Sequence, residues 1–311
     1  MTTHVFIDGG AGTTGLQIHE RLAGRSEIAL IQLGEDQRKD PAARKAALND
    51  ADIVILCLPD DAARESVSLI GNDRTKVIDA STAHRIAPGW VYGFPEVSGH
   101  DAVAASSRVS NPGCYSTGFI ALIAPLVKAG LMPKDALLTC NAVSGYSGGG
   151  KSMIADYEGE TGAPSSWRGY ALTMAHKHVP EMQVQCGLNA APLFTPAVVP
   201  LYSGMIVEVP LQLATIAGAP SGKAIRDILA EFYAGSPIVS VPADYDGNGL
   251  LPVERLSGTD RMELYVFANE ERRQARMVAM LDNLGKGASG AAVQNLNILA
   301  GLEETAGLRL G

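Results

Sequence analysis

The stretch His4-Val-Phe-Ile-Asp-Gly-Gly-Ala-Gly-Thr-Thr-Gly15 indicates the fold class of this 311-residue chain. A short apolar run leads directly into three glycines spaced G-x-x-G-x-x-G and then into a helical pattern. Glycines let the backbone turn tightly and approach a pyrophosphate, and a helix N-terminus offers unpaired N–H groups. The order strand, loop, helix therefore predicts a dinucleotide site at Gly9, Gly12 and Gly15. The spacing differs from the commoner G-x-G-x-x-G, so a glycine-rich turn without a ligand is the alternative.

The rest of the first ~110 residues continues this alternation of apolar runs and helical patterns. The run 52–58 (DIVILCL) is nearly continuous in apolar residues, which is typical of a strand buried in a parallel sheet. Strands alternating with helices at this spacing predict an α/β fold with a Rossmann-type, doubly wound parallel sheet. The expected strands are 4–8, 28–33, 52–58, 76–80 and 108–109, and the expected helices are 14–23, 41–49 and 60–70.

Strands dominate from about residue 136 to 285, which predicts a second, α+β domain with a mixed or antiparallel sheet. Asn269–Arg273 has the composition of a hairpin turn between the last two strands. A helical pattern at 288–302 is long enough to return to the first domain. We therefore expect one domain of residues 1–113 with 286–311, and a second of residues 114–285. The expected strands of the second domain are 136–143, 198–213, 238–241, 262–268 and 275–281.

Composition excludes several classes of protein. Hydrophobic residues make up 46% of the chain, charged residues 19%, and the net charge is −8. Partners such as nucleic acids or anionic membranes require a dominant basic surface, so neither is expected. No apolar run approaches a membrane span, and no signal-peptide pattern precedes the first strand. The four cysteines contain no C-x-x-C pair, which favours free thiols in a cytoplasmic protein without a metal site.

The end of the second expected strand should contain the residue that binds the adenosine ribose. Glu35 and Asp36 are suited to a 2′-hydroxyl, as in NAD, whereas Arg38 and Lys39 are suited to a 2′-phosphate, as in NADP. We favour NADP. The alternative without a ligand is a solvated, charged loop.

The segment Gly145–Ser152 (GYSGGGKS) matches two unrelated motifs. It fits the phosphate-loop pattern G-x-x-x-x-G-K-[ST] and, at Ser147, the G-x-S-x-G of serine hydrolases. Both motifs need a substantial helix after the loop, whereas the helical pattern here is short and broken after Tyr157. We therefore favour a third interpretation, a glycine-rich backbone nest with Lys151 that binds a phosphate or carboxylate. A flexible loop without a ligand is the remaining alternative.

The segment Ser110-Asn-Pro-Gly-Cys-Tyr-Ser-Thr-Gly118 contains the candidate nucleophile, Cys114. A short strand precedes it and an apolar helix begins near Tyr115, so Cys114 is expected at a helix N-terminus. There the dipole and the free N–H groups favour the thiolate and can bind an oxyanion. Asn111 is a candidate extra donor or a cap of the helix. The other three cysteines lie in apolar runs or lack an electropositive setting, and are expected to be buried and structural.

A thiolate nucleophile needs a base nearby, and the candidates are His176 and His178 in AHKHVPE. Pro180 predicts a rigid loop or strand end here, and Glu181 is placed to orient an imidazole. The pattern alone does not choose between the two histidines, and it also allows a pair on the surface.

Together these segments resemble N-acetyl-gamma-glutamyl-phosphate reductases of the shorter subgroup, within the wider semialdehyde and glyceraldehyde-3-phosphate dehydrogenase-like superfamily. The resemblance rests on Asn111-Pro-Gly-Cys-Tyr115, His176-Lys-His-Val-Pro-Glu181, the loops 9–15 and 143–151, and the C-terminal 283–295. It covers almost the whole chain. Two residues depart from the family pattern: Ser116 replaces a usual proline, and Gly10 a usual alanine.

The resemblance implies NADPH-dependent reduction of N-acetyl-glutamyl phosphate to the semialdehyde in arginine biosynthesis, through a Cys114 thioester. It implies that the first domain binds NADP and that the second is catalytic and forms a homo-oligomer, a dimer or a tetramer. His178 would be the acid/base, oriented by Glu181. The implied cofactor contacts are Gly9, Gly12, Thr13, Thr14, Gly15, Arg38, Lys39, Leu58, Pro59, Ser81 and Asn295. The implied substrate contacts are Asn111, Ser144, Gly145, Lys151 and Lys177. Three alternatives to this function remain. The chain could reduce aspartyl phosphate or a carrier-bound aminoadipyl phosphate, or it could be a non-catalytic NADP-binding regulator.

Overall fold

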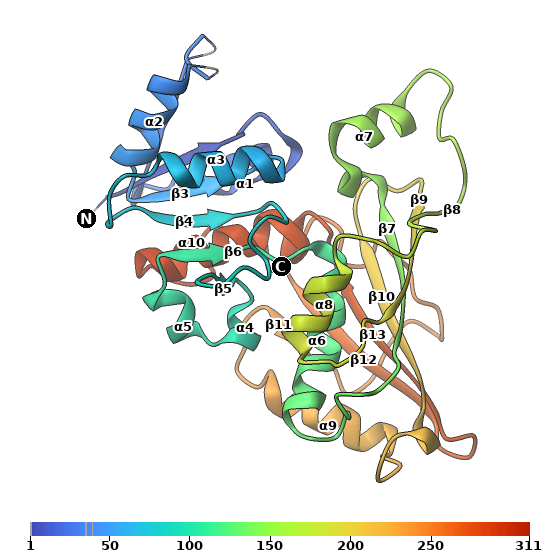
Figure 1. Cartoon of the computed structure of the whole chain (residues 1–311). Helices are drawn as coiled ribbons and strands as arrows, with labels where there is room; N and C mark the ends of the chain where they lie inside the picture. The colour runs from blue at the N-terminus through green and yellow to red at the C-terminus, as the bar shows by residue number, and fades with distance from the viewer. Residues whose placement is uncertain (1, 35, 39) are drawn as a thin grey trace. The chain divides into compact units, whose positions relative to one another are not determined.

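The structure is a computed structural model that describes residues 2–34, 36–38 and 40–311 (Figure 1). The chain divides into two compact units. The first contains Met1–Gly113 and Ala288–Leu308, and the second contains Cys114–Gly287 and Arg309–Gly311.

The first unit is built on a six-stranded sheet in the order β2-β1-β3-β4-β6-β5, and every neighbouring pair in it is parallel. This confirms the predicted Rossmann-type sheet. The strands are β1 (Thr3–Asp8), β2 (Ile28–Ile31), β3 (Ile53–Leu56), β4 (Lys76–Asp79), β5 (Val91–Tyr92) and β6 (Arg108–Ser110). The helices are α1 (Thr13–Leu22), α2 (Pro41–Asp50), α3 (Asp60–Leu69), α4 (Pro95–Ser98), α5 (His100–Ala105) and α10 (Gly290–Ala300).

Both faces of this sheet are buried, which explains the continuous apolar run in β3. Ile53 and Ile55 pack in a cluster with side chains of α1, α5 and α10, while Val54 and Leu56 pack in another with α2 and α3. Figure 1 shows α3 and α10 on opposite sides of the sheet. Because successive strand residues point to opposite faces, a strand covered on both sides must be apolar at every position. The C-terminal helix therefore completes the core of the N-terminal sheet.

The second unit is built on a mixed seven-stranded sheet in the order β11-β12-β13-β10-β7-β9-β8, as predicted for this domain. Helices α6 and α9 cover one face of it, α6 against β10 and β13 and α9 against β12. The strands are β7 (Thr139–Gly145), β8 (Arg168–Gly169), β9 (Leu193–Val199), β10 (Met205–Gln212), β11 (Val239–Ser240), β12 (Met262–Asn269) and β13 (Gln274–Leu281). The helices are α6 (Cys114–Lys128), α7 (Gly150–Glu158), α8 (Val179–Cys186) and α9 (Gly222–Phe232).

Two predictions for this unit were wrong. The single strand expected at 198–213 is two strands, β9 and β10, with a turn at Pro200–Gly204 between them. Gly204 has φ +121, and a Cβ there would lie 2.5 Å from the carbonyl oxygen of Val253, so only glycine fits. Helix α9 was missed, although Ser221 caps it by accepting from the N–H of Ala224.

One further prediction needs correction at a helix start. The rigid loop expected around Pro180 is the first turn of α8, where a proline is favoured because that N–H has no helical partner. The short helical pattern expected to break after Tyr157 is the nine-residue helix α7, which ends at Glu158 and follows a 3-10 turn at Tyr146–Gly149. The helix at the C-terminus begins at Gly290, after a π-helical turn at Gly285–Ser289.

Helix α6 is the most apolar helix near the expected nucleophile, and its residues from Tyr115 to Leu126 are buried. It contains Pro125 and has 15 residues. Within the described part of the chain, no helix is long and apolar enough to cross a membrane.

Candidate active site

The glycine loop after β1 has the geometry that close approach of a ligand requires. Gly9 has φ +84, and a Cβ there would lie 2.4 Å from the carbonyl oxygen of Cys57. The N–H of Gly12 donates to the carbonyl of Gly9 at 3.0 Å, which closes the turn. Helix α1 begins at Thr13, with Gly12 in the capping position and without a side-chain cap. Because α1 has no side-chain cap, the N–H groups of its first turn suit a pyrophosphate.

Three other predicted cofactor residues follow strands of the same parallel sheet. Leu58 and Pro59 come after β3, and Ser81 comes after β4. A Cβ on Gly9 would lie 3.0 Å from a methyl carbon of Leu58, so Leu58 borders the glycine loop. Ser81 is buried and donates from Oγ to Asp79 at 2.8 Å. Since parallel strands end at one edge of their sheet, these residues share the edge at which α/β sheets bind ligands.

Asn295 on α10, a predicted cofactor contact, is a buried amide with one unpaired atom. It is fully buried, and its Nδ2 donates to the carbonyl of Gly93 at 2.8 Å and to Oδ1 of Asn111 at 3.2 Å. Its own Oδ1 is buried and has no hydrogen-bond partner among the described residues. Leaving a buried acceptor unpaired costs about 1–3 kcal/mol. The carboxamide N–H₂ of a nicotinamide is a donor of the kind that would pair with it.

Asn111 positions the backbone that leads to Cys114. Its Nδ2 donates to the carbonyl of Ala288 at 2.9 Å, and its backbone N–H donates to Asp79 at 2.7 Å. Arg85, which sequence reasoning missed, donates from Nε to the Asn111 carbonyl at 3.0 Å. Asn111 is 1% exposed and both ends of its amide are paired, which supports a role in positioning this backbone; the substrate contact stays a prediction.

The predicted ribose-binding residues are only partly described, because Glu35 and Lys39 lie outside the described residues. Arg38 is exposed. Burial, and to a smaller extent the nearby Arg38 charge, lowers the pKa of His19. The ring of His19 lies beneath the glycine loop, since a Cβ on Gly10 would come within 2.7 Å of its Nε2. Arg38 is therefore close to the dinucleotide loop, and glycine replaces the family's usual alanine at position 10 where a methyl group would clash.

Cys114 is the first residue of α6 and is partly exposed. The segment after β13 packs tightly against it, since a Cβ on Gly287 would lie 2.9 Å from the Cβ of Cys114. Burial raises the pKa of the Cys57 thiol to about 12 and also raises the pKa values of the Cys140 and Cys186 thiols. Those three cysteines remain protonated at neutral pH. Cys114 thus has the only helix-terminal, partly exposed position of the four.

Helix α8 brings His178 and Glu181 to α6. Ser116 donates from Oγ to the carbonyl of His178 at 3.3 Å. The Nε2 of His178 lies 4.0 Å from Oε1 of Glu181, and 7% and 1% of the two side chains are exposed. The ring of His178 is 5.9 Å from that of Tyr115, the neighbour of Cys114. Ser116, which departs from the family pattern, therefore links the helix of the nucleophile to the helix of the histidine.

His176 has a different position from His178. Its Nδ1 accepts from the backbone N–H of His178 at 3.1 Å, so Nδ1 carries no proton in this arrangement. The two imidazole rings meet edge to face at 4.7 Å. This geometry makes His176 a support for the turn that presents His178, and it distinguishes two histidines that the sequence alone left equivalent.

Two tyrosines that sequence reasoning missed complete the surroundings of Cys114. Tyr115 and Tyr170 are within hydrogen-bonding reach of each other, and their rings lie 6.5 Å apart. Burial raises the pKa of both hydroxyls, and the adjacent Cys114 charge raises them further. Both therefore remain protonated donors at neutral pH. Tyr115 directly follows the nucleophile, but Tyr170 carries no motif, and only the tertiary structure identifies it.

The glycine-lysine loop follows β7, whose neighbours are antiparallel β10 and parallel β9. A phosphate loop of a nucleotide hydrolase needs a parallel sheet around it, so this setting does not fit that alternative. Ser147 is 1% exposed, and its Oγ accepts from Asn283 at 2.9 Å, which excludes the serine-nucleophile interpretation. Ser144 and Gly145 are buried, whereas the side chains of Lys151 and Lys177 are exposed.

Comparisons with known proteins agree with this geometry. Residues 114–283 match the family model "Semialdehyde dehydrogenase, dimerisation domain", and residues 36–105 match "Semialdehyde dehydrogenase, NAD binding domain". Aspartate semialdehyde dehydrogenase II from Vibrio cholerae shares the fold, with a TM-score of 0.70, 18% identity and coverage of 96% of this chain and 98% of that chain. The class is therefore that of the semialdehyde dehydrogenases, oxidoreductases with a nicotinamide-dinucleotide domain.

More similar relatives narrow the class. A protein of Chelativorans sp. (strain BNC1) named N-acetyl-gamma-glutamyl-phosphate reductase is 52% identical, covering 96% of this chain and 98% of its own. One of the same name from Trichormus variabilis is 49% identical over 98% of each chain. The chain belongs to the N-acetyl-gamma-glutamyl-phosphate reductase family.

Proposed function

We propose that this chain reduces N-acetyl-γ-glutamyl phosphate to the semialdehyde and phosphate in arginine biosynthesis, with NADPH. The observation that carries the proposal is the position of Cys114 at the first residue of α6, with the buried pair His178 and Glu181 on the adjoining helix α8. A cysteine at a helix N-terminus beside a histidine is the arrangement that activates a thiolate. The relatives described above carry the name of this activity.

Cys114 performs the covalent step of the proposed mechanism. Its thiolate attacks the acyl carbon, the bond from that carbon to the phosphate oxygen breaks, and a thioester forms as phosphate leaves. The glycine loop at Gly9, Gly12 and Gly15 would hold NADPH, which would supply the hydride that reduces this thioester. The N–H groups of the first turn of α6 stabilise the oxyanion. When the thiolate forms, His178 accepts the thiol proton; as the aldehyde forms, the sulfur of Cys114 leaves and takes this proton back from His178, which Glu181 orients.

The test is a panel of acyl phosphates with NADPH and NADH, monitored by nicotinamide oxidation. We expect turnover of N-acetyl-γ-glutamyl phosphate with NADPH and little with aspartyl phosphate or a carrier-bound aminoadipyl phosphate. Faster turnover of either of these two acyl phosphates would identify it as the substrate in place of N-acetyl-γ-glutamyl phosphate. Cofactor binding without any turnover, and without sensitivity to alkylation of Cys114, would favour the non-catalytic regulator. Magnesium-dependent ATP binding that Lys151→Ala removes would restore the phosphate-loop alternative.

Arg38 is proposed to bind the 2′-phosphate that distinguishes NADP from NAD. We expect Arg38→Gln to raise KM for NADPH at least ~10-fold while KM for NADH changes little, because a charge-assisted contact to phosphate is lost. Arg64→Gln is the matched control, since Arg64 is an exposed arginine of α3 that pairs with Asp61. Equal KM changes for the two cofactors would contradict this role and direct attention to Asp36.

The first unit is proposed to bind the cofactor, and the second to carry catalysis and self-association. Side chains of Lys151 and Lys177 are the proposed cations for the substrate phosphate, with Ser144 and Gly145 lining that loop. We expect the enzyme to work in the cytoplasm, where its free thiols stay reduced.

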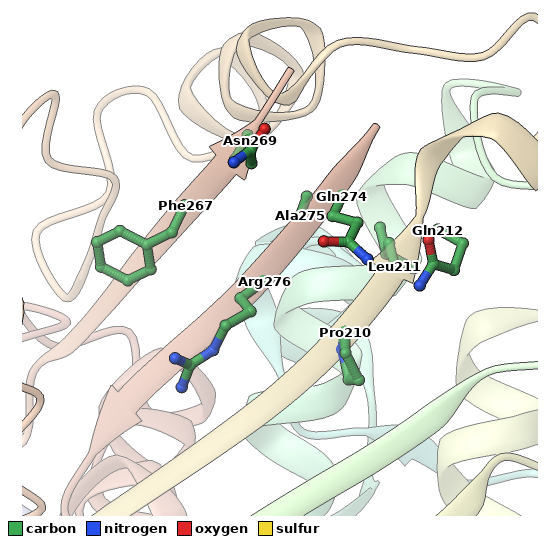
Figure 2. Close-up of a pocket in the computed structure, with 9 residues that line it drawn as sticks. Pro210, Leu211, Gln212, Phe267, Asn269, Gln274, Ala275 and Arg276 are labelled. Atoms are coloured by element: carbon green, nitrogen blue, oxygen red, sulfur yellow. The ribbon is translucent and has the colours of Figure 1, made fainter. Parts of the chain in front are cut away.

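The sheet face opposite α6 and α9 is the proposed contact between two copies. A hollow of about 560 Å³ lies there, between the ends of β10, β12 and β13. Figure 2 shows Pro210, Phe267 and Arg276 among the residues that line it. The loop 243–257 covers part of this face and leaves Leu250 73% exposed. A large open hollow with exposed apolar side chains is typical of an interaction surface. The matched family model is that of a dimerisation domain.

A homo-oligomer is the expected state in solution. Light scattering should give two or four times the 32.5 kDa of one chain. Leu250→Asp should shift the mass toward the monomer, because a charge cannot be buried in an apolar contact without a large cost. Ile86→Asp, at a residue 51% exposed in the first unit, is the control and should leave the mass unchanged. A monomeric wild type would contradict this proposal.

A further inference from the structure

Arg168 on β8 is a partly buried cation whose guanidinium is open for a ligand. Its side chain makes no hydrogen bond and no ion pair within the described part of the chain. Its charge is instead placed over the ring of Tyr157, 5.3 Å from the centroid. Among the described residues, one other arginine lies over an aromatic ring: Arg255, over Tyr245. Arg255 also pairs with two carboxylates, those of Asp246 and Glu263.

An aromatic stack fixes the ring on which Arg168 lies. Tyr157 stacks on Tyr146 at 4.9 Å with an interplanar angle of 13°. Tyr146 meets Tyr202 edge to face at 5.7 Å, and its hydroxyl donates to Glu158 at 2.9 Å. A guanidinium attracted to the face of an aromatic ring keeps its N–H groups available for a further partner. The tyrosine stack therefore holds the charge of Arg168 over Tyr157 without providing a hydrogen-bond acceptor for it.

The position of Arg168 connects it to the nucleophile through Tyr170. Arg168 pairs with Val198 of β9, and the N–H of Tyr170 donates to Pro196, which extends this pairing. Residues two apart along a strand face the same side and lie about 7 Å apart. Arg168 is thus on the side of β8 where Tyr170 meets Tyr115, the neighbour of Cys114.

We propose that Arg168 binds the α-carboxylate of the substrate, the anionic group at the end opposite the reacting acyl carbon. A planar fork with free N–H groups matches a carboxylate bidentately, whereas the ammonium groups of the exposed Lys151 and Lys177 are point charges on flexible stems. This inference rests on the proposed function. By this inference, Arg168 selects acyl phosphates that also carry a free carboxylate. Arg168 lies outside every motif of the sequence.

The experiment compares two aldehydes in the reverse, phosphate-dependent reaction with NADP. One is N-acetyl-glutamate semialdehyde, and the other is 4-acetamidobutanal, which differs only by lacking the α-carboxylate. The wild type should prefer the first by ~10²–10³-fold in kcat/KM, because a site built for a charged partner rejects an analogue without it. Arg168→Met should reduce kcat/KM for the semialdehyde by the same factor and leave the analogue unchanged. Arg168→Lys should fall between them.

The controls separate the alternatives. Lys177→Met should leave the ratio of the two aldehydes unchanged, and a collapse of the ratio in this variant would assign the carboxylate to Lys177. Equal losses on both aldehydes in Arg168→Met would identify a structural role and overturn the inference while the proposed function stands. A wild type inactive on the semialdehyde would contradict the proposed function itself, and the carboxylate assignment with it.

Discussion

Cys114→Ser is expected to reduce the NADPH-dependent reductase turnover at least ~10³-fold. The hydroxyl of serine stays protonated at neutral pH, so the helix N-terminus that favours a thiolate gives little help to an alcohol. A factor of 10³ corresponds to about 4 kcal/mol of lost transition-state stabilisation. Steady-state assays under saturating NADPH measure the loss. Retention of more than a few percent of turnover would exclude the thioester mechanism.

Chemical labelling provides the control for this variant. Burial raises the pKa values of the Cys57, Cys140 and Cys186 thiols, so iodoacetamide near neutral pH should label Cys114 alone. Substrate should protect it, and cofactor binding in Cys114→Ser should match that of the wild type. Rapid labelling of two or more cysteines in the folded protein would contradict the prediction that Cys114 is the one reactive thiol of the four.

The first unit was predictable from sequence because its physics is local and repetitive. Strands buried on both faces must be apolar at consecutive positions, and glycines with no room for a Cβ mark the ligand loop. The predicted and observed ends of β3 differ by one residue at the start and two at the end. The returning helix α10 was also visible as a pattern, since it is buried almost all round.

The second unit was harder because long apolar runs conceal its turns. Between Val198 and Leu213 only Gly204, with its positive φ, forces the reversal that separates β9 from β10. The start of α8 was misread because a proline both restricts the residue before it and suits the first turn of a helix. Pattern alone did not decide between these effects, and the tertiary setting favours the helix.

Some residues of the candidate site could be identified from local sequence, and others only from tertiary contacts. Cys114 was identified by its local position at a helix start, which sequence specifies. Arg168 and Tyr170 follow an irregular segment without periodicity, and their relevance depends on rings contributed by distant elements such as Tyr115 and Tyr157. The choice of His178 over His176 rested on resemblance. The hydrogen bond from the His178 N–H to the ring of His176 now supports it physically.

His178→Asn is expected to reduce kcat by ~10²–10⁴-fold, the range of a positioned acid/base group. Without the imidazole the sulfur of Cys114 leaves the tetrahedral intermediate unprotonated, and the thiolate loses its neighbouring proton acceptor. KM for the substrate should change little, because the role concerns the transition state. The rate of alkylation of Cys114 against pH provides a second readout. Its midpoint should move toward the value of a free thiol in the variant.

His176→Asn is the matched control for this prediction. The Oδ1 of asparagine can accept the His178 N–H in place of Nδ1, so the turn into α8 should persist and turnover should stay within ~10-fold of the wild type. His176→Ala, which removes the acceptor, should lose more activity than His176→Asn. If His176→Asn loses as much activity as His178→Asn and the alkylation midpoint moves only in the His176 variant, the acid/base is His176. The roles of the two histidines would then be exchanged. A residue that only accepts the backbone hydrogen bond of its neighbour would not change the alkylation midpoint of Cys114.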